Sequence, residues 1–255
     1  MGRRLRLHLP STGGSGNRCS TFQFLGENTM SQLINIFLEP GKVFAGLKAK
    51  PTFLVPALVI AGLAILAMTL YFFNVDAEWF MNHQLQVVGK DMSAAELEQV
   101  KAFMPSARTS AYIAAPSVVI MMGVIFSLTA LYYMLAGRVS GNPTSFRHGL
   151  SLATWSSMPL VLASVIAIIG VYTSSPQSTY ESLQLLSIDP LFVQLETGHP
   201  WAALARMFSL LNLWVWFLAA LGWKTWYRTS WGQALFVVLL PNVVIFGGMA
   251  LYAAL

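Results

Sequence analysis

The sequence predicts an all-α integral membrane protein with five transmembrane helices, short amphipathic N-terminal helices and one small extracytoplasmic helix. The first observation is composition: 56% of the 255 residues are hydrophobic and 10% are charged, whereas soluble domains carry about 25% charged residues. The second is that five apolar stretches are each long enough to cross a bilayer, which takes roughly 20 residues. The third is that basic residues gather at alternate ends of these stretches.

The chain before the first apolar stretch has two parts. Residues 1–29 contain a cluster of arginines and a Gly/Ser-rich run, and no apolar run of a signal peptide follows. We expect this leader to be disordered, and one hypothesis is that Met30 is the true start. In residues 30–52, apolar positions at helical spacing alternate with lysines. This cytoplasmic segment is expected to lie in the membrane interface or to pack on the ends of the spans.

A membrane domain is expected over residues 53–255. Its predicted spans are 53–73, 112–136, 150–172, 201–223 and 233–253.

Several local features refine this prediction. Ser93 and Glu96 form a capping-box pattern, which predicts the small helix in the polar loop 74–111. Pro159 predicts a kink in the third span, and Arg206 is expected to snorkel from the outer end of the fourth. Gly123 with Ser127, and Ala163 with Ala167, are small pairs that would let helices approach closely. The tryptophans near span ends, Trp223 and Trp226 among them, are typical of an interfacial belt.

Charge predicts the orientation. Eleven of the fifteen Lys and Arg residues lie on the N-terminal side of the alternating topology, and eight of the ten acids lie on the other side. Because basic loops stay in the cytoplasm, we expect a cytoplasmic N-terminus and, with five spans, an extracytoplasmic C-terminus. The net charge of +5 is therefore attributed to topology and anionic lipid rather than to nucleic acid.

The sequence offers no constellation for catalysis, so we expect no enzyme. No Asp, Glu, Lys or His lies well inside a predicted span, although ion-coupled transporters and intramembrane enzymes need such groups. The four histidines are scattered over the leader and three loops, and Cys19 is the only cysteine. We therefore predict no catalytic residues, no cofactor and no metal site.

Polar side chains in the spans allow two interpretations. Four of them enter the third span and two lie deeper in the fourth and fifth: Ser151, Thr154, Ser156, Ser157, Asn212 and Asn242. They could line a polar path or hold a lipid headgroup. Alternatively, they could hydrogen-bond between helices, which is worth about 0.6 kcal/mol per pair.

Two stretches carry a resemblance to a known family. They are NIFLEPGKVFAGLKAKPTFLVPALV near the N-terminus and GRVSGNPTSFRHGLSLATWSSMPLVL at the centre. Residues 37–255 resemble the bacterial branch of the Yip family, named for interaction with Ypt/Rab GTPases. Seven residues match the family pattern and are predicted to have structural or interaction roles: Phe37, Pro40, Phe44, Gly137, Gly141, Phe146 and Pro159.

The resemblance implies a five-span protein without catalytic residues. Eukaryotic members are implied to act in vesicle traffic at Golgi and endoplasmic reticulum membranes. They have a long cytoplasmic N-terminus and an Asp-Leu-Tyr-Gly-Pro-like motif, and this sequence shows neither, so GTPase binding is doubtful.

Two functions from different classes remain. The first is a membrane scaffold or organising protein in a bacterial inner membrane, with the lipid bilayer and a second copy or other membrane proteins as partners. The alternative is a permease or channel for a lipid or small molecule that uses the polar third span.

Overall fold

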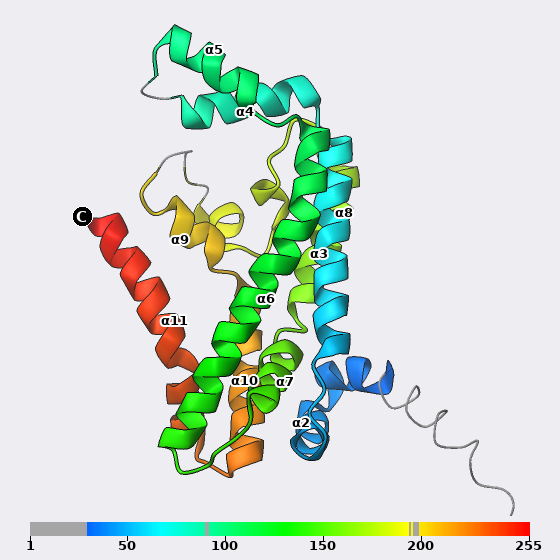
Figure 1. The fold of residues 1–255 in the computed structure, drawn as a ribbon, viewed down its shortest axis with the longest axis vertical. Coiled ribbons are helices and arrows are strands. Elements are labelled where there is room, and N and C mark those ends of the chain that lie inside the picture. The colour runs from blue at the N-terminus through cyan, green and yellow to red at the C-terminus, as the bar shows by residue number, and fades with distance from the viewer. Residues whose placement is uncertain (1–29, 90–91, 194, 196–198) are drawn as a thin grey trace, which may run out of the picture.

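Long helices run along the length of the molecule and shorter ones cover its two ends (Figure 1). The computed structural model describes residues 30–89, 92–193, 195 and 199–255. Within these residues the structure is helical, without a strand, apart from one isolated antiparallel bridge between Ser187 and Ser209. The all-α prediction is confirmed for this part of the chain, and the leader 1–29 lies outside it.

The long helices alternate in direction (Figure 1). The chain passes in turn along α3 (Leu54–Asn74), α6 (Ala107–Val139), the pair α7 (Phe146–Ser156) and α8 (Leu160–Thr173), α10 (Leu210–Tyr227) and α11 (Trp231–Ala254). The turn between α6 and α7 and the turn between α10 and α11 therefore lie at one end of the molecule. The connections from α3 to α6 and from α8 to α10 lie at the other.

Membrane embedding is supported by the length and apolarity of these helices. α3, α6 and α11 are each long and apolar enough to cross a bilayer, and α7 with α8 makes a fourth span if the bent pair is counted as one. The predicted first span coincides with α3, and the second and fifth lie within α6 and α11. α10 has 18 residues with Lys224 in its last turn and is not among the helices that qualify, so the count of five stays a prediction.

The predicted kink in the third span is confirmed. α7 and α8 meet at 41° across a break of three residues that ends with Pro159. Proline has no N–H to donate. The next amides instead make shorter-range bonds of 3.0 Å, from Leu160 to Ser157 and from Val161 to Met158.

The expected fourth span, 201–223, is not one helix. α9 (Ala202–Met207) ends before Phe208, and α10 begins at Leu210 after a Ser209 cap. The backbone between them pairs with an earlier segment, because Phe208 accepts from Ile188 at 2.9 Å and Leu210 donates to Leu186 at 3.0 Å. These long-range bonds replace the helical ones.

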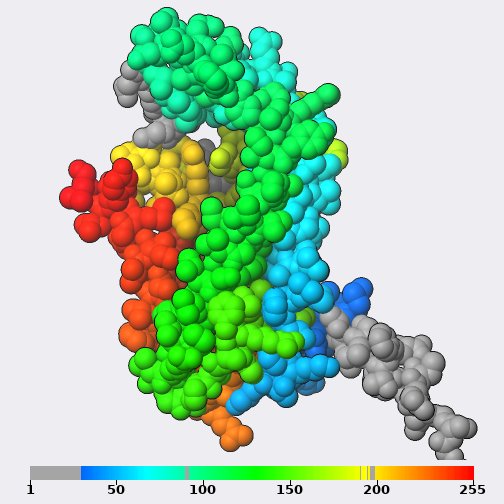
Figure 2. Space-filling model, in the orientation of Figure 1, coloured from blue at the N-terminus to red at the C-terminus, as the bar shows by residue number. Residues whose placement is uncertain are grey.

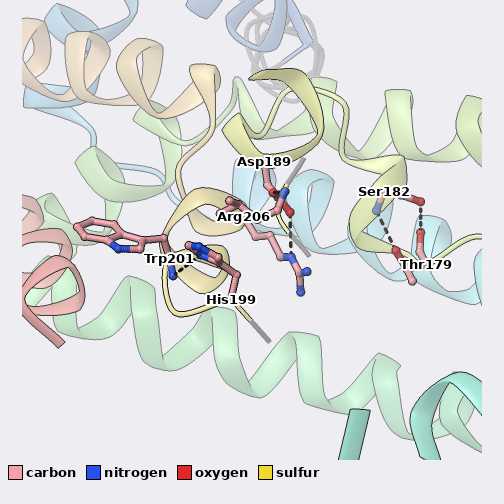
Figure 3. Close-up of polar contacts among 7 residues, drawn as sticks. Thr179, Ser182, Asp189, His199, Trp201 and Arg206 are labelled. Atoms are coloured by element: carbon pink, nitrogen blue, oxygen red, sulfur yellow. Dashed lines mark hydrogen bonds and ion pairs between the residues drawn. The ribbon is translucent and has the colours of Figure 1, made fainter. Parts of the chain in front are cut away.

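The sequence analysis expected Arg206 to snorkel from the outer end of a continuous fourth span. That span is broken, so Arg206 has a different setting. It lies in the short α9, and its Nε donates to Asp189 Oδ2 at 3.1 Å (Figure 3). Asp189 begins η2 (Asp189–Val193), and η1 (Glu181–Leu183) precedes it.

The end of the molecule that carries α4 (Ala77–Val88) and α5 (Ala94–Phe103) is assembled from short helices (Figure 1). The small helix predicted from Ser93 and Glu96 is confirmed as α5. Both halves of the capping box are present there: the Ser93 side chain accepts from the Glu96 amide, and the Glu96 carboxylate accepts from the Ser93 amide at 2.7 Å.

The opposite end is covered by the N-terminal segment. Residues 30–38 are helical, and α2 (Pro40–Ala49) follows them. α2 buries Val43, Phe44 and Leu47 against the bundle, chiefly against α10, and leaves its lysines exposed. The principal hydrophobic core lies toward this end, where buried residues of α2, α7, α10 and α11 cluster with Ile60 of α3 and Tyr133 of α6.

Candidate functional site

We call the packed region formed by α2, the α6–α7 turn, α7 and the C-terminal half of α10 the basic-end junction. The elements at this end carry seven basic side chains of the described chain: Lys42, Lys48, Lys50, Arg138, Arg147, Lys224 and Arg228. Glu39 accompanies them and pairs with Lys42 at 2.8 Å. This end is therefore strongly positive.

Two glycines inside the junction have close neighbours on other helices. A Cβ built on Gly222 of α10 would lie 2.5 Å from Leu152 of α7 and 2.9 Å from the Phe44 ring of α2. A Cβ on Gly149 would lie 2.4 Å from the backbone oxygen of Ala130 in α6. The contact at Gly149 is with backbone, which cannot adjust as a side chain can, so Gly149 sets the spacing of α6 and α7. At Gly222, side chains of α2 and α7 occupy the space that a side chain of α10 would need.

Tryptophan side chains bond to backbone carbonyls across the junction. The indole N–H of Trp226 donates to the Phe44 carbonyl at 2.7 Å, and that of Trp155 donates to the Thr52 carbonyl at 2.8 Å. Lys48 Nζ in turn donates to the Trp226 carbonyl. Trp155, Trp223 and Trp226 are at most 2% exposed. The belt interpretation is therefore wrong for Trp223 and Trp226, which lie in the core together with Trp155.

Charged and polar side chains of the α6–α7 region attach the N-terminal segment further. Arg147 Nε donates to the Pro51 carbonyl at 3.0 Å, and His148 Nε2 lies 3.2 Å from the Lys48 carbonyl. Because a carbonyl can only accept, Nε2 carries the hydrogen in that contact. The Tyr227 hydroxyl donates to Thr144 at 2.9 Å. Each of these bonds joins segments that are far apart in the sequence.

The structure brings most of the predicted candidates to this end. Phe37 packs edge-on against Trp214 at 5.6 Å, Pro40 begins α2, and Phe44 is completely buried. α2 contacts α7, and Arg147, His148 and Trp155 of the central stretch bond to Pro51, Lys48 and Thr52 of the N-terminal stretch, so the two stretches that carried the resemblance meet here.

The remaining candidates have varied surroundings. Gly141 has a positive φ of 73° in the α6–α7 turn, a region that favours glycine. A Cβ on Gly137 would lie 2.9 Å from the Asn142 oxygen. Phe146 is 39% exposed at the start of α7, and Pro159 is buried at the break after α7. A functional role for any of the seven candidates stays a prediction.

Sequence reasoning missed Gly149, Gly222, Trp155 and Trp226, which hold the junction together. Gly149 and Trp155 lie within the central block, but their residue types alone gave no sign that another backbone would touch them. Gly222 and Trp226 sit in an apolar run whose neighbours cannot be inferred from spacing.

The polar side chains of the spans mostly satisfy themselves on their own helices. Thr154, Ser156 and Ser157 donate to carbonyls four residues earlier at 2.7–2.8 Å, and Asn242 donates to Val238 in the same way. Such bonds are intrahelical, so the expected interhelical bonding is wrong for these four. Ser151 Oγ is buried and has no hydrogen-bond partner among the residues that the structure describes.

The described part of the chain holds no group of three or more His, Cys, Asp or Glu residues able to bind a metal. His148 lies at the basic-end junction, whereas His83 lies on α4 at the other end. The buried groups of the junction are tryptophans, hydroxyls and backbone amides, and these support packing rather than acid–base chemistry.

Comparison with protein families settles the relationship. The family model of the Yip1 domain matches residues 34–253, which include all the elements that form the basic-end junction. The chain belongs to the Yip1 family. The Yip1 domain is not known as an enzyme family. No curated protein and no solved structure matches the chain.

Proposed function

We propose that this Yip1-domain protein is a non-enzymatic scaffold of a bacterial inner membrane that binds a second copy or another membrane protein through its helices. The observation that carries the proposal is an open small-residue face on α6. Gly123 and Ser127 are both exposed, and a Cβ on Gly123 would meet nothing within 4 Å. Exposed small residues let a neighbouring transmembrane helix approach closely.

The other small pair supports this assignment by contrast. Ala167 is 1% exposed on α8, so that position is already used inside the bundle. Among the three helices that qualify alone as membrane spans, α6 has the lowest share of residues buried, 11% in its most apolar window. Its outward face is therefore free for lipid or for a partner helix, and the small residues favour a helix.

Affinity purification in a mild detergent, followed by cross-linking, tests the proposal. The wild-type chain is expected to form a dimer or to retain a membrane partner, and Gly123→Ile is expected to lose it. Gly62→Ile is the matched control, because Gly62 is an exposed glycine of α3 whose Cβ would also meet nothing within 4 Å. A wild-type protein that is strictly monomeric and without a partner contradicts the proposal, and so does an equal loss in both variants.

The proposed orientation places the basic-end junction in the cytoplasm and the C-terminus outside. It is supported by the seven bases at that end and by the alternating course of the long helices (Figure 1). A reporter that is active only in the cytoplasm, fused after Leu255, is expected to be inactive. Activity of that fusion would contradict the five-span topology.

The permease alternative has less support. The hydroxyls of Ser156 and Ser157 bond to carbonyls of their own helix, which leaves few free polar groups along α7 for a substrate. Alanine substitution of Ser156, Ser157 and Asn242 together is expected to leave the flux of lipids and small molecules unchanged. A clear loss of flux would favour the permease over the scaffold.

A further inference from the structure

A cavity of about 790 Å³ lies at the end opposite the basic-end junction. It opens between α4, the outer end of α3, and the segment from η1 to α9. Figure 2 shows the molecule hollowed between α9 and the underside of the α4–α5 region. The volume falls within the range of about 300–1,000 Å³ typical of small-molecule sites.

One wall of this cavity is aromatic and apolar. Phe80 of α4 packs edge-on against Phe72 of α3 at 5.7 Å, Phe72 against Tyr71 at 5.2 Å, and Tyr71 against Tyr180 at 5.4 Å. Met68 extends the lining one turn deeper along α3. Because α3 qualifies as a membrane span, this wall leads from the polar end of the molecule toward the bilayer.

The lining of the cavity also contains polar residues, with one positive and one negative group available to a ligand. Asp189 is buried and already engaged, since it accepts from Arg206 Nε at 3.1 Å and from the Leu195 amide at 2.8 Å. The terminal nitrogens of Arg206 point away from that carboxylate (Figure 3), and its side chain is 36% exposed. Arg206 can therefore bind an anionic group as well.

Glu181 supplies the negative group. It is exposed on η1, it lines the cavity, and it forms no ion pair within the described part of the chain. Burial and the neighbouring Glu181 carboxylate together raise the pKa of the Tyr180 hydroxyl. Thr179 and Ser182, which hydrogen-bond to each other (Figure 3), line the same cavity, and their hydroxyls add hydrogen-bond acceptors.

We propose that this cavity binds a zwitterionic phospholipid with a primary-amine headgroup. The phosphate lies at the free nitrogens of Arg206, the ammonium donates to Glu181 and the adjacent hydroxyls, and an acyl chain follows the aromatic wall toward Met68. An anionic lipid without an amine leaves Glu181 unpaired. A quaternary ammonium cannot donate hydrogen bonds to a carboxylate, so phosphatidylcholine fits less well. The site is independent of the proposed scaffold role.

The test uses the full chain, purified in detergent and freed of lipid, with an acyl-labelled phosphatidylethanolamine as the fluorescent probe. Unlabelled phosphatidylethanolamine is expected to compete roughly tenfold better than phosphatidylcholine or phosphatidylglycerol, the effect of about one charged hydrogen bond. Free phosphoethanolamine is expected to compete far more weakly, because it lacks the chain. Equal competition by the three lipids overturns the proposal. Strong competition by free phosphoethanolamine overturns the claim that the acyl chain contributes to binding.

Variants locate the binding. Glu181→Gln is expected to weaken phosphatidylethanolamine binding about tenfold without changing phosphatidylcholine. Glu98→Gln, on the exposed side of α5, is the matched control and is expected to change neither. Val87→Trp places a large side chain at a half-exposed lining position of α4 and is expected to abolish binding of all lipids. Unaltered probe binding in Glu181→Gln or in Val87→Trp overturns the assignment.

Discussion

The two ends of the molecule are built in opposite ways. At the basic-end junction, the backbones of α6 and α7 touch at Gly149, side chains of α2 and α7 pack onto Gly222, and buried indoles bond to carbonyls of distant segments. At the end that carries α4 and α5, short helices and irregular turns enclose a cavity of about 790 Å³. Apolar residues are abundant at both ends. The difference shows that tight packing depends on where small residues and bonding side chains meet, rather than on hydrophobicity alone.

The largest difference between the two ends is expected when one glycine at each end is replaced by alanine, which adds one methyl group. In Gly149→Ala the new Cβ would lie 2.4 Å from a backbone oxygen of α6, which cannot move without shifting the helix. We expect a loss of stability of about 1–3 kcal/mol or more. In Gly170→Ala the nearest atom is a side-chain carbon of Leu183 at 3.3 Å, which can adjust.

Thermal unfolding in detergent measures both variants against the wild type. Gly149→Ala is expected to lower the unfolding temperature by clearly more than Gly170→Ala. Equal shifts of the unfolding temperature would contradict the contrast between the two ends, because the end that carries α4 and α5 would then be packed as rigidly as the basic-end junction.

A smaller effect is expected from removing one hydrogen bond at each end. Trp226→Phe deletes a buried bond of 2.7 Å to the Phe44 carbonyl, which holds α10 to α2. Tyr71→Phe deletes a partly buried bond of 3.1 Å to the Ser178 carbonyl. We expect a cost of about 1–3 kcal/mol for the first and about 0.5–1.5 kcal/mol for the second.

Amide hydrogen exchange distinguishes the two. Exchange in α2 is expected to rise in Trp226→Phe, whereas in Tyr71→Phe the rise is expected to stay in the loop that contains Ser178. Protection of α2 that is unchanged in Trp226→Phe would show that packing alone holds this helix.

The smallest effect concerns pH at α5. Hydrogen bonds from the Ser93 hydroxyl and amide hold the pKa of Glu96 below its ordinary value. A depressed folded-state pKa means that the cap stabilises α5 fully above the ordinary pKa of about 4.3 and is lost as pH falls through the depressed value. Amide protection factors of α5 are therefore expected to stay constant from neutral pH down to about 4.3 and to fall below it.

Glu96→Gln is the matched control for this experiment, since glutamine keeps the capping geometry and does not titrate. Its α5 protection factors are expected to change less with pH. A similar fall in the basic-end helices would instead indicate a change of the whole molecule.

Much of the fold could be predicted because its signals are local. A run of about twenty predominantly apolar residues predicts α3 wherever it packs. Pro159 removes an N–H whatever its neighbours are, and the capping box of α5 spans four residues. The break at Phe208 could not be predicted, because the bonds that replace helix there come from Leu186 and Ile188 in an earlier loop. The same holds for Arg206, whose partner Asp189 belongs to that loop.

By itself, the sequence determined that this is an all-α membrane protein of the Yip family, with its bases gathered at alternate ends of the apolar stretches. These properties follow from composition, periodicity and local motifs, which need no knowledge of neighbours. Only the tertiary structure decided which tryptophans form the core, which glycines have close neighbours on other helices, and where a cavity is left. Those outcomes depend on contacts between residues far apart in the chain, and the distance between two helices is fixed only when both are present.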